Sequence, residues 1–202
     1  MRSGKLTKER LLDETTKLVQ TKGFGATSLN ELLAVAGIKK GSLYYHFTDK
    51  DHLGLAVLER AKTRFLESLD ELLFTSTPTI SIHKFLDFVL DRHRKKGFTG
   101  GCLFGNTALE MSDADNRYAV CVSDLFQEWI TRIEAVILSG QQAGEFRSDI
   151  PAADLAQVFV STIEGGIMMS RLKKEEGPLK TCLETLMTFL RAEQRQTSNS
   201  SQ

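Results

Sequence analysis

The sequence predicts an all-α protein of about nine helices, with three short helices at the N-terminus followed by a larger helical bundle. Apolar residues recur at intervals of three and four along most of the chain, as on one face of a helix. Only three prolines occur in 202 residues, so long helices are unobstructed. No segment shows the convincing polar and apolar alternation of a half-buried strand.

Composition narrows the class of protein. Hydrophobic residues make up 41% and charged residues 26%, which is ordinary for a soluble globular chain. Three cysteines stand far apart, so neither a disulfide framework nor a structural zinc site is expected. The charged N-terminus is unlike a signal peptide, and the longest apolar stretch, residues 32–38, cannot span a bilayer. The sequence favours a cytoplasmic protein without metal or cofactor.

Charge is unevenly distributed along a chain that is neutral overall. Residues 1–50 hold nine Lys and Arg against five Asp and Glu, a net charge of +4. Residues 51–202 hold 17 against 21, a net charge of −4. A small basic unit therefore precedes a larger acidic body, and overall neutrality does not argue against a nucleic-acid partner.

The N-terminal helices are marked by their caps and stops. A first helix ends at Gly23, because glycine readily adopts the left-handed conformation that closes a helix. Residues 28–31, Ser-Leu-Asn-Glu, form a capping box that begins a short helix ending at about Ala36. Gly37 breaks this helix, and a second short helix follows over residues 39–46.

Glycine and proline also divide the rest of the chain. We expect a helix from Lys50 to Phe74, a second from after Pro78 to the Gly97–Gly101 loop, and a third from Cys102 to Met111. A fourth helix includes Tyr118 and ends at Gly144. The last two run from Pro151 to about Leu172 and from about Leu179 to Ala192. The expected domains are residues 1–48 and 49–193, followed by a polar tail, 194–202, that is expected to be disordered.

The two short helices and their glycine turn have the dimensions of a helix-turn-helix, whose second helix can enter the major groove of DNA. The second helix and the start of the next one are rich in cations and hydrogen-bond donors, and a glycine allows close approach to a backbone. The candidate DNA-binding residues are Lys39, Lys40, Gly41, Ser42, Tyr44, Tyr45, His46 and Lys50.

Three segments carry a family resemblance. Residues 27–31 (TSLNE), 36–47 (AGIKKGSLYYHF) and 50–53 (KDHL) resemble the N-terminal DNA-binding domain of TetR-family repressors, and the match runs from about Lys8 to Leu58. The resemblance implies a two-domain fold whose C-terminal part binds a small ligand and forms a homodimer. It also implies phosphate contacts by Thr27 and Lys50, and it adds Ser28 to the DNA-binding candidates.

The aromatic residues of the second short helix have two possible roles. We expect Leu43 and Phe47 to be core anchors, which is the usual role of apolar residues at helical spacing. Tyr44 and Tyr45 are adjacent and cannot both face one core, so we assign both to DNA. A merely solvated or structural role remains open for Lys39 and His46.

Two apolar stripes in the last two helices are candidates for a four-helix interface between two subunits. The first stripe includes one of two consecutive glycines, which are costly inside a helix unless close packing requires them. The alternative is that both stripes pack within their own subunit. The candidate interface residues are Val158, Phe159, Thr162, Ile163 and Gly166 in one helix and Leu179, Leu183, Leu186 and Leu190 in the other.

Aromatic, methionine and cysteine side chains of the bundle could line a mainly apolar ligand site, although such residues are more often plain core. The candidates are Phe65, Phe85, Phe88, Cys102, Phe104, Met111, Phe126, Trp129 and Met168.

Residues 100–110 resemble a G-C-L…N-x-A-x-E segment of one TetR subgroup, whose members include regulators of responses to electrophiles. Cys102 would lie at a helix N-terminus, which favours the thiolate and lowers the pKa. A reactive sensor thiol and a small packing cysteine are both open.

No enzyme motif withstands inspection. The glycine-rich Gly97–Gly105 loop lacks the Gly-Lys-Ser/Thr ending of a phosphate-binding loop, and the four histidines have no metal-ligand spacing. We therefore expect a sequence-specific repressor that acts as a homodimer on a palindromic operator and is released by a small molecule or a reactive electrophile. The alternative is an all-helical ligand-binding or interaction module that does not bind DNA.

Overall fold

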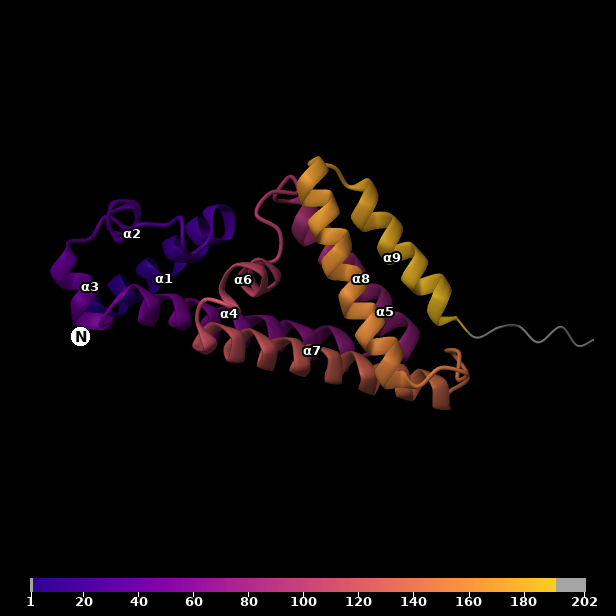
Figure 1. The fold of residues 1–202 in the computed structure, drawn as a ribbon. Helices are drawn as coiled ribbons and strands as arrows, with labels where there is room; N and C mark the ends of the chain where they lie inside the picture. The colour runs from indigo at the N-terminus through magenta and orange to yellow at the C-terminus, as the bar shows by residue number, and fades with distance from the viewer. Residues whose placement is uncertain (1, 192–202) are drawn as a thin grey trace, which may run out of the picture.

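The computed structural model describes residues 2–191, which form nine α-helices and no β-strand (Figure 1). The all-α prediction is confirmed. The tail, residues 194–202, lies outside the described residues. No helix between residues 2 and 191 is long and apolar enough to cross a membrane. The helices are α1 (Arg2–Lys22), α2 (Leu29–Ala36), α3 (Lys40–His46), α4 (Lys50–Leu73), α5 (Pro78–Arg94), α6 (Leu103–Met111), α7 (Asn116–Gln142), α8 (Ala152–Lys173) and α9 (Gly177–Leu190).

Local chemistry sets the ends of the first helices as the sequence predicts. Gly23 follows α1 with φ +88°, and Gly37 closes α2 with φ +61°, so both occupy the left-handed region that favours glycine. The Ser28 hydroxyl accepts from the amide of Glu31 while the Glu31 carboxylate accepts from the amide of Ser28. This capping box satisfies donors that would otherwise be orphaned at the start of α2.

The last helix begins two residues earlier than expected. The sequence predicts its start at about Leu179, but Gly177 and Pro178 form the first turn of α9, and the break after α8 covers residues 174–176. Proline is tolerated there because the first-turn amides of a helix have no intrahelical partner and the fixed φ of proline is already helical.

Helix α4 joins the two ends of the molecule. Figure 1 shows α1, α2 and α3 as a small unit at one end, with α4 leaving that unit and running beside α7 into the bundle that contains α5, α8 and α9. Helix α4 packs against α1 in the small unit and against α5 and α7 in the bundle. Helix α6 lies between the small unit and α8 (Figure 1). A shift of α4 or α6 would therefore move the N-terminal unit relative to the bundle.

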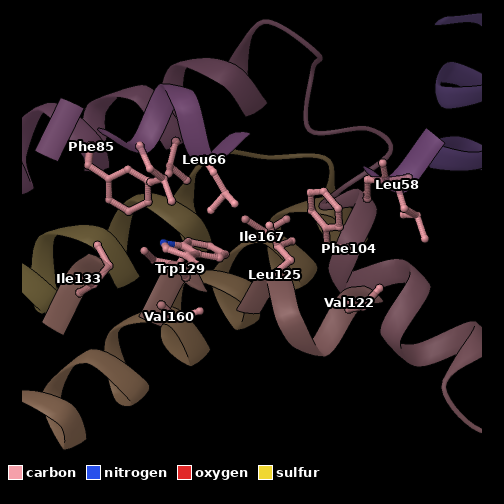
Figure 2. Close-up of a cluster of buried hydrophobic side chains, with 14 of the residues drawn as sticks. Leu58, Leu66, Phe85, Phe104, Val122, Leu125, Trp129, Ile133, Val160 and Ile167 are labelled. Atoms are coloured by element: carbon pink, nitrogen blue, oxygen red, sulfur yellow. The ribbon is translucent and has the colours of Figure 1, made fainter. Parts of the chain in front are cut away.

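A continuous apolar core fills the bundle around Trp129 of α7 (Figure 2). The ring of Phe65 meets the Trp129 ring edge-on at 5.0 Å between centroids, and Phe85 does so at 6.0 Å. Phe126 stacks on the same indole at 6.0 Å. Offset and edge-on contacts of this kind add to the stabilisation from burial, so α4, α5 and α7 are fixed around one side chain.

The apolar stripes of α8 and α9 pack mainly against their own chain. Seven of the nine residues that the sequence assigned to a subunit interface are buried within the subunit: Phe159, Ile163, Gly166, Leu179, Leu183, Leu186 and Leu190. Gly166 allows α9 to approach, since an added Cβ would lie 3.1 Å from both Leu179 and Cys182. Val158 is exposed and Thr162 is half-buried. The assignment of the other seven is therefore corrected, because a side chain that fills the core of its own subunit is not free to contact a second one.

Candidate nucleic-acid interface and internal cavity

Two buried anchors fix α3 on the N-terminal unit. Leu43 and Phe47 are almost fully buried, as the sequence predicts. The Lys8 ammonium lies 5.6 Å from the centroid of the Phe47 ring, and the His52 ring meets that ring edge-on at 5.4 Å. Because the inner side of this short helix is held, its other side chains point away from the unit.

The outer face of α3 is cationic and aromatic. Lys39, Lys40, Gly41 and Tyr44 are exposed, and Tyr45 is 82% exposed, so neither tyrosine belongs to the core. The Lys40 ammonium lies 5.7 Å from the centroid of the Tyr44 ring. No other atom lies within 4 Å of the position that a Cβ at Gly41 would occupy, which leaves room for close approach of another surface.

Three further candidates lie beside this face. Ser42 and His46 of α3 are half-buried, and the His46 ring lies 4.9 Å from the Tyr45 ring. Lys50 begins α4 and is half-buried. Asp49 caps α4 by accepting from the His52 amide at 2.7 Å, and this hydrogen bond lowers the pKa of the Asp49 carboxyl.

Thr27 does not present its side chain to a ligand. The residue is fully buried, and its hydroxyl donates to the carbonyl oxygen of Gly23 at 2.6 Å. The side chain thereby stabilises the turn between α1 and α2, which corrects the expectation of a phosphate contact. Ser28 is exposed, but its hydroxyl is engaged in the capping box with Glu31.

A carboxylate of α6 holds the turn between α1 and α2. Glu110 accepts from the amide of Phe24 at 2.9 Å with Oε2 and from the amide of Gly25 at 2.6 Å with Oε1. Hydrogen bonds to an ionised group are stronger than those between neutral groups. The carboxylate thus ties the N-terminal unit to the bundle, a role that the sequence motif alone did not reveal.

A second polar contact joins the same parts. The Gln20 side-chain amide of α1 donates to the carbonyl of Gly101 at 2.7 Å and accepts from the Lys96 ammonium at 2.9 Å. Asn106 of α6 donates to the carbonyl of Gly100 at 2.6 Å and accepts from Arg171 of α8 at 2.6 Å. We call the contacts made by Gln20, Asn106 and Glu110 the junction contacts.

A cavity of about 760 Å³ opens beside the junction contacts, between α1, α4, α5, α6, α7 and α8. Five of the nine expected lining residues contribute to its wall: Phe65, Phe88, Cys102, Phe104 and Trp129. The other four do not line it. Phe85 and Phe126 pack on Trp129 within the core, Met111 lies at the end of α6, and Met168 is 54% exposed.

Ionisable residues that the sequence did not single out also line the cavity, among them Glu164 and His93. Burial raises the pKa of Glu164 to about 7 and lowers the pKa of His93 to about 4, with Arg92 adding to the effect on the histidine. The buried Oε1 of Glu164 has no hydrogen-bond partner. A single glutamate within an apolar helix gives no sequence signal, because only the fold brings it to a cavity.

Cys102 lies at the N-cap of α6, with its sulfur accepting from the amide of Gly105 at 3.5 Å. Burial and the neighbouring Glu164 carboxylate nevertheless raise the pKa of the thiol well above its usual range. The expectation that the helix terminus lowers this pKa is therefore wrong. Among residues 2–191 no group of three or more His, Cys, Asp or Glu side chains could hold a metal ion.

Known protein families match both the N-terminal and the C-terminal part of the chain. Residues 11–57 match the profile of bacterial regulatory proteins of the tetR family, and residues 80–186 match the tetracyclin repressor-like C-terminal domain. The transcriptional regulator AcuR of Cereibacter sphaeroides is 28% identical over 81% of this chain and 76% of its own. The transcriptional repressor DhaR of a Mycobacterium species is 22% identical over 96% and 97%.

Solved structures agree with this result. The regulatory protein TetR from Rhodobacter sphaeroides superposes with a TM-score of 0.87 at 26% identity, over 92% of this chain and 99% of that one. The reduced form of NemR from E. coli superposes with a TM-score of 0.85 at 24% identity, over 92% and 97%, and shows the fold alone.

An exposed basic α3 joined by α4 to a helical body with a cavity defines a helix-turn-helix regulator. The chain belongs to the TetR family of bacterial transcriptional regulators, so it is a DNA-binding regulator of transcription. The family comprises regulators rather than enzymes. A helical module unrelated to DNA is set aside.

Replacing Glu110 by Ala removes both acceptors of the Phe24 and Gly25 amides. We expect an unfolding free energy lower by about 1–3 kcal/mol, since a hydrogen bond to a charged group contributes about that much. Exchange of these two amide hydrogens, followed by NMR, should accelerate. The matched change Glu67→Ala, at an exposed site on α4, should alter neither; unchanged exchange in Glu110→Ala would remove the proposed role of the carboxylate.

The raised pKa of Glu164 makes stability fall as pH rises from about 4.5 to about 7, because the folded state retains a proton that the unfolded state has lost. The shift corresponds to about 3 kcal/mol above pH 7. Glu164→Gln lacks this effect, so its stability relative to the natural protein should increase over that range in urea denaturation at fixed protein concentration. Parallel pH profiles would contradict the assignment; Glu67→Gln is the exposed control.

Proposed function

We propose that the protein represses transcription as a homodimer on a palindromic operator and that a small molecule in the cavity releases it. The observation that carries this proposal is the outward face of α3, where cations and hydrogen-bond donors surround an unobstructed glycine. Each subunit would place α3 in a major groove, with half-site centres about 34–36 Å apart. A DNA regulator works where the chromosome is, so we place it in the cytoplasm.

We divide the DNA contacts by the chemistry of the side chains. Lys39, Lys40 and Lys50 suit phosphates, and the first-turn amides of α4 add a favourable dipole. Tyr44 and Tyr45 suit phosphates, base edges or thymine methyl groups. Other contacts would come from the backbone of Gly41 and from the side chains of Ser42 and His46. Ser28 would lie at the edge of the surface.

The outer face of α8 is the surface that we propose for dimerisation. Val158, Met169 and Leu172 are exposed on this face, and Phe189 of α9 is also exposed. An added Cβ at Gly165 would meet no other atom within 4 Å. A glycine in a helix costs about 1 kcal/mol relative to alanine, and close approach of a second subunit would account for it. Val158 and Thr162 remain from the sequence-based set.

Effector release would act through the cavity wall that touches the junction contacts. Gln20 and Gly101 line the cavity, and the hydrogen bond between them connects α1 to the loop before α6. A ligand that fits better when this loop and α6 are displaced would change the separation of the two α3 helices. We favour reversible binding over electrophile attack at Cys102, because its raised thiol pKa leaves little thiolate. We propose that residues 1–48 form the DNA-binding domain and residues 49–193 the ligand-binding and dimerisation domain.

Replacing Lys50 by Ala should weaken binding to the DNA upstream of its own gene about tenfold. It should also reduce the slope of log K against log salt by about 1, because one phosphate contact is lost. Tyr44→Ala should weaken binding similarly, and gel-shift titrations at several salt concentrations measure both. Lys84→Ala, an exposed lysine on α5, is the control. Equal salt slopes in the Lys50 and Lys84 variants would exclude the proposed contact.

Replacing Val158 by Glu should convert the dimer to a monomer in sedimentation velocity, because the charge would have to be buried at the interface. The matched variant Ile80→Glu changes a side chain of similar exposure, 49% against 48%, on another helix. It should remain dimeric. If the Val158 variant stays dimeric, the subunits pair through another surface.

A further inference from the structure

Glu164 is the only carboxylate of the cavity wall that pairs with no cation among the described residues. It lies in α8 beside the Cys102 thiol, and its Oε2 lies against the backbone of Gly105, where any side chain would collide with it. Its buried Oε1 accepts no hydrogen bond. A hydrogen bond with the Cys102 thiol favours the charged form of Glu164, but burial disfavours that form more strongly. A cation from outside the chain would therefore meet a carboxylate whose charge the protein does not neutralise.

Four aromatic residues line the same cavity as this carboxylate. Phe65, Phe88, Phe104 and Trp129 all contribute to the wall. The Phe65 ring lies 5.0 Å from the indole and 6.3 Å from the Phe104 ring, measured between centroids. Figure 2 shows Phe104, Ile167 and Trp129 close together in this region. Ring faces attract a cation, and aromatic enclosures are a recurring means of holding amines.

Several other charged groups of the cavity wall are paired with one another. Arg60 contacts Glu9 and Asp13, with Arg64 also beside Asp13, and Lys17 is paired with Glu14. Lys96 donates to Gln20. Arg92 is exposed, and Arg10 is exposed at the mouth.

Two other groups of the wall are uncharged at physiological pH. His93 is held unprotonated and the Cys102 thiol is held protonated, because burial lowers the pKa of the first and raises the pKa of the second. Neither group therefore offers Glu164 a positive charge, and no cation among the described residues forms an ion pair with it.

We propose that the effector is an amine with an apolar or aromatic body, and that its cationic nitrogen pairs with Glu164 among the aromatic rings of the cavity. This inference rests on the proposed effector role of the cavity. The amine supplies the charge and the hydrogen-bond donor that Oε1 lacks, and its body fills the apolar wall. A carboxylic acid of the same shape would face like-charge repulsion from Glu164.

Three probes with one body separate these cases: 4-phenylbutylamine, 4-phenylbutanol and 4-phenylbutanoate. Trp129 is the only tryptophan of the chain and lines the cavity, so its fluorescence reports local binding, with calorimetry as a second measurement. At pH 8 we expect the amine to bind the intact protein about tenfold or more tightly than the alcohol, and the acid to bind most weakly.

Glu164→Gln should lower amine affinity about tenfold while leaving alcohol affinity within about twofold, because the charge is removed but the shape is kept. Glu14→Gln makes the same chemical change at the cavity mouth and should preserve the preference for the amine. The urea denaturation described above verifies that both variants are folded.

The proposal is overturned if the acid binds as tightly as the amine, if Glu164→Gln leaves amine affinity unchanged, or if none of the probes binds at millimolar concentration. Operator binding, measured separately by gel shift, distinguishes this result from failure of the proposed function. Amine binding without operator binding would contradict the repressor role but support an amine as the ligand. Operator binding without a preference for the amine would support the repressor role but contradict an amine as the ligand.

Discussion

The junction contacts fix the N-terminal unit on the bundle, together with the packing of α1 on α4 and the edge-on contact of the Phe24 ring with the Tyr118 ring. Helix α4 is the continuous covalent link between the two parts, and Arg60 of α4 forms ion pairs with Glu9 and Asp13 of α1. Glu110 and Gln20 add to this constraint by holding the turn after α1 and the last turn of α1 against the body. The orientation of α3 is therefore set from within the body, even though α3 lies far from α8 (Figure 1).

The cavity is built from the same parts that make this constraint. The cavity wall includes α1, α8 and the loop that precedes α6. The atoms that a bound ligand would touch are therefore among those that orient the N-terminal unit. Arg171 of α8 reaches Asn106 of α6, and Asn106 holds the loop that Gln20 contacts. If a ligand binds in the cavity, its coupling to the N-terminal unit needs no long path, because the cavity wall adjoins the junction contacts.

Most of the fold was predictable because it depends on local chemistry. Short segments determine the helix ends, as shown by the capping box of Ser28 and Glu31 and by the glycines that follow α1 and α2. Helical spacing alone identifies the buried residues Leu43 and Phe47. Thr27 was misassigned because the family resemblance carries a position but no rotamer, and only the structure shows its hydroxyl turned into the loop.

The cavity and the subunit surface were harder to predict, because they depend on how distant helices meet. A stripe of apolar residues states that a face is buried but not what buries it, and the stripes of α8 and α9 cover each other in the structure. Glu164 carries no pattern at all. The predicted direction of the Cys102 pKa shift was wrong, because the prediction considered the helix terminus but not the burial of the thiol.

Three consecutive residues of α8 face three different environments. Glu164 faces the cavity, Gly165 faces open space, and Gly166 lies against α9. If two subunits meet over Gly165, each cavity is separated from the other subunit by the width of one helix. Filling the first cavity would then press on the backbone that the second subunit touches, so the two sites of a dimer would not fill independently. The steepness of the regulatory response would be set by this one turn of helix.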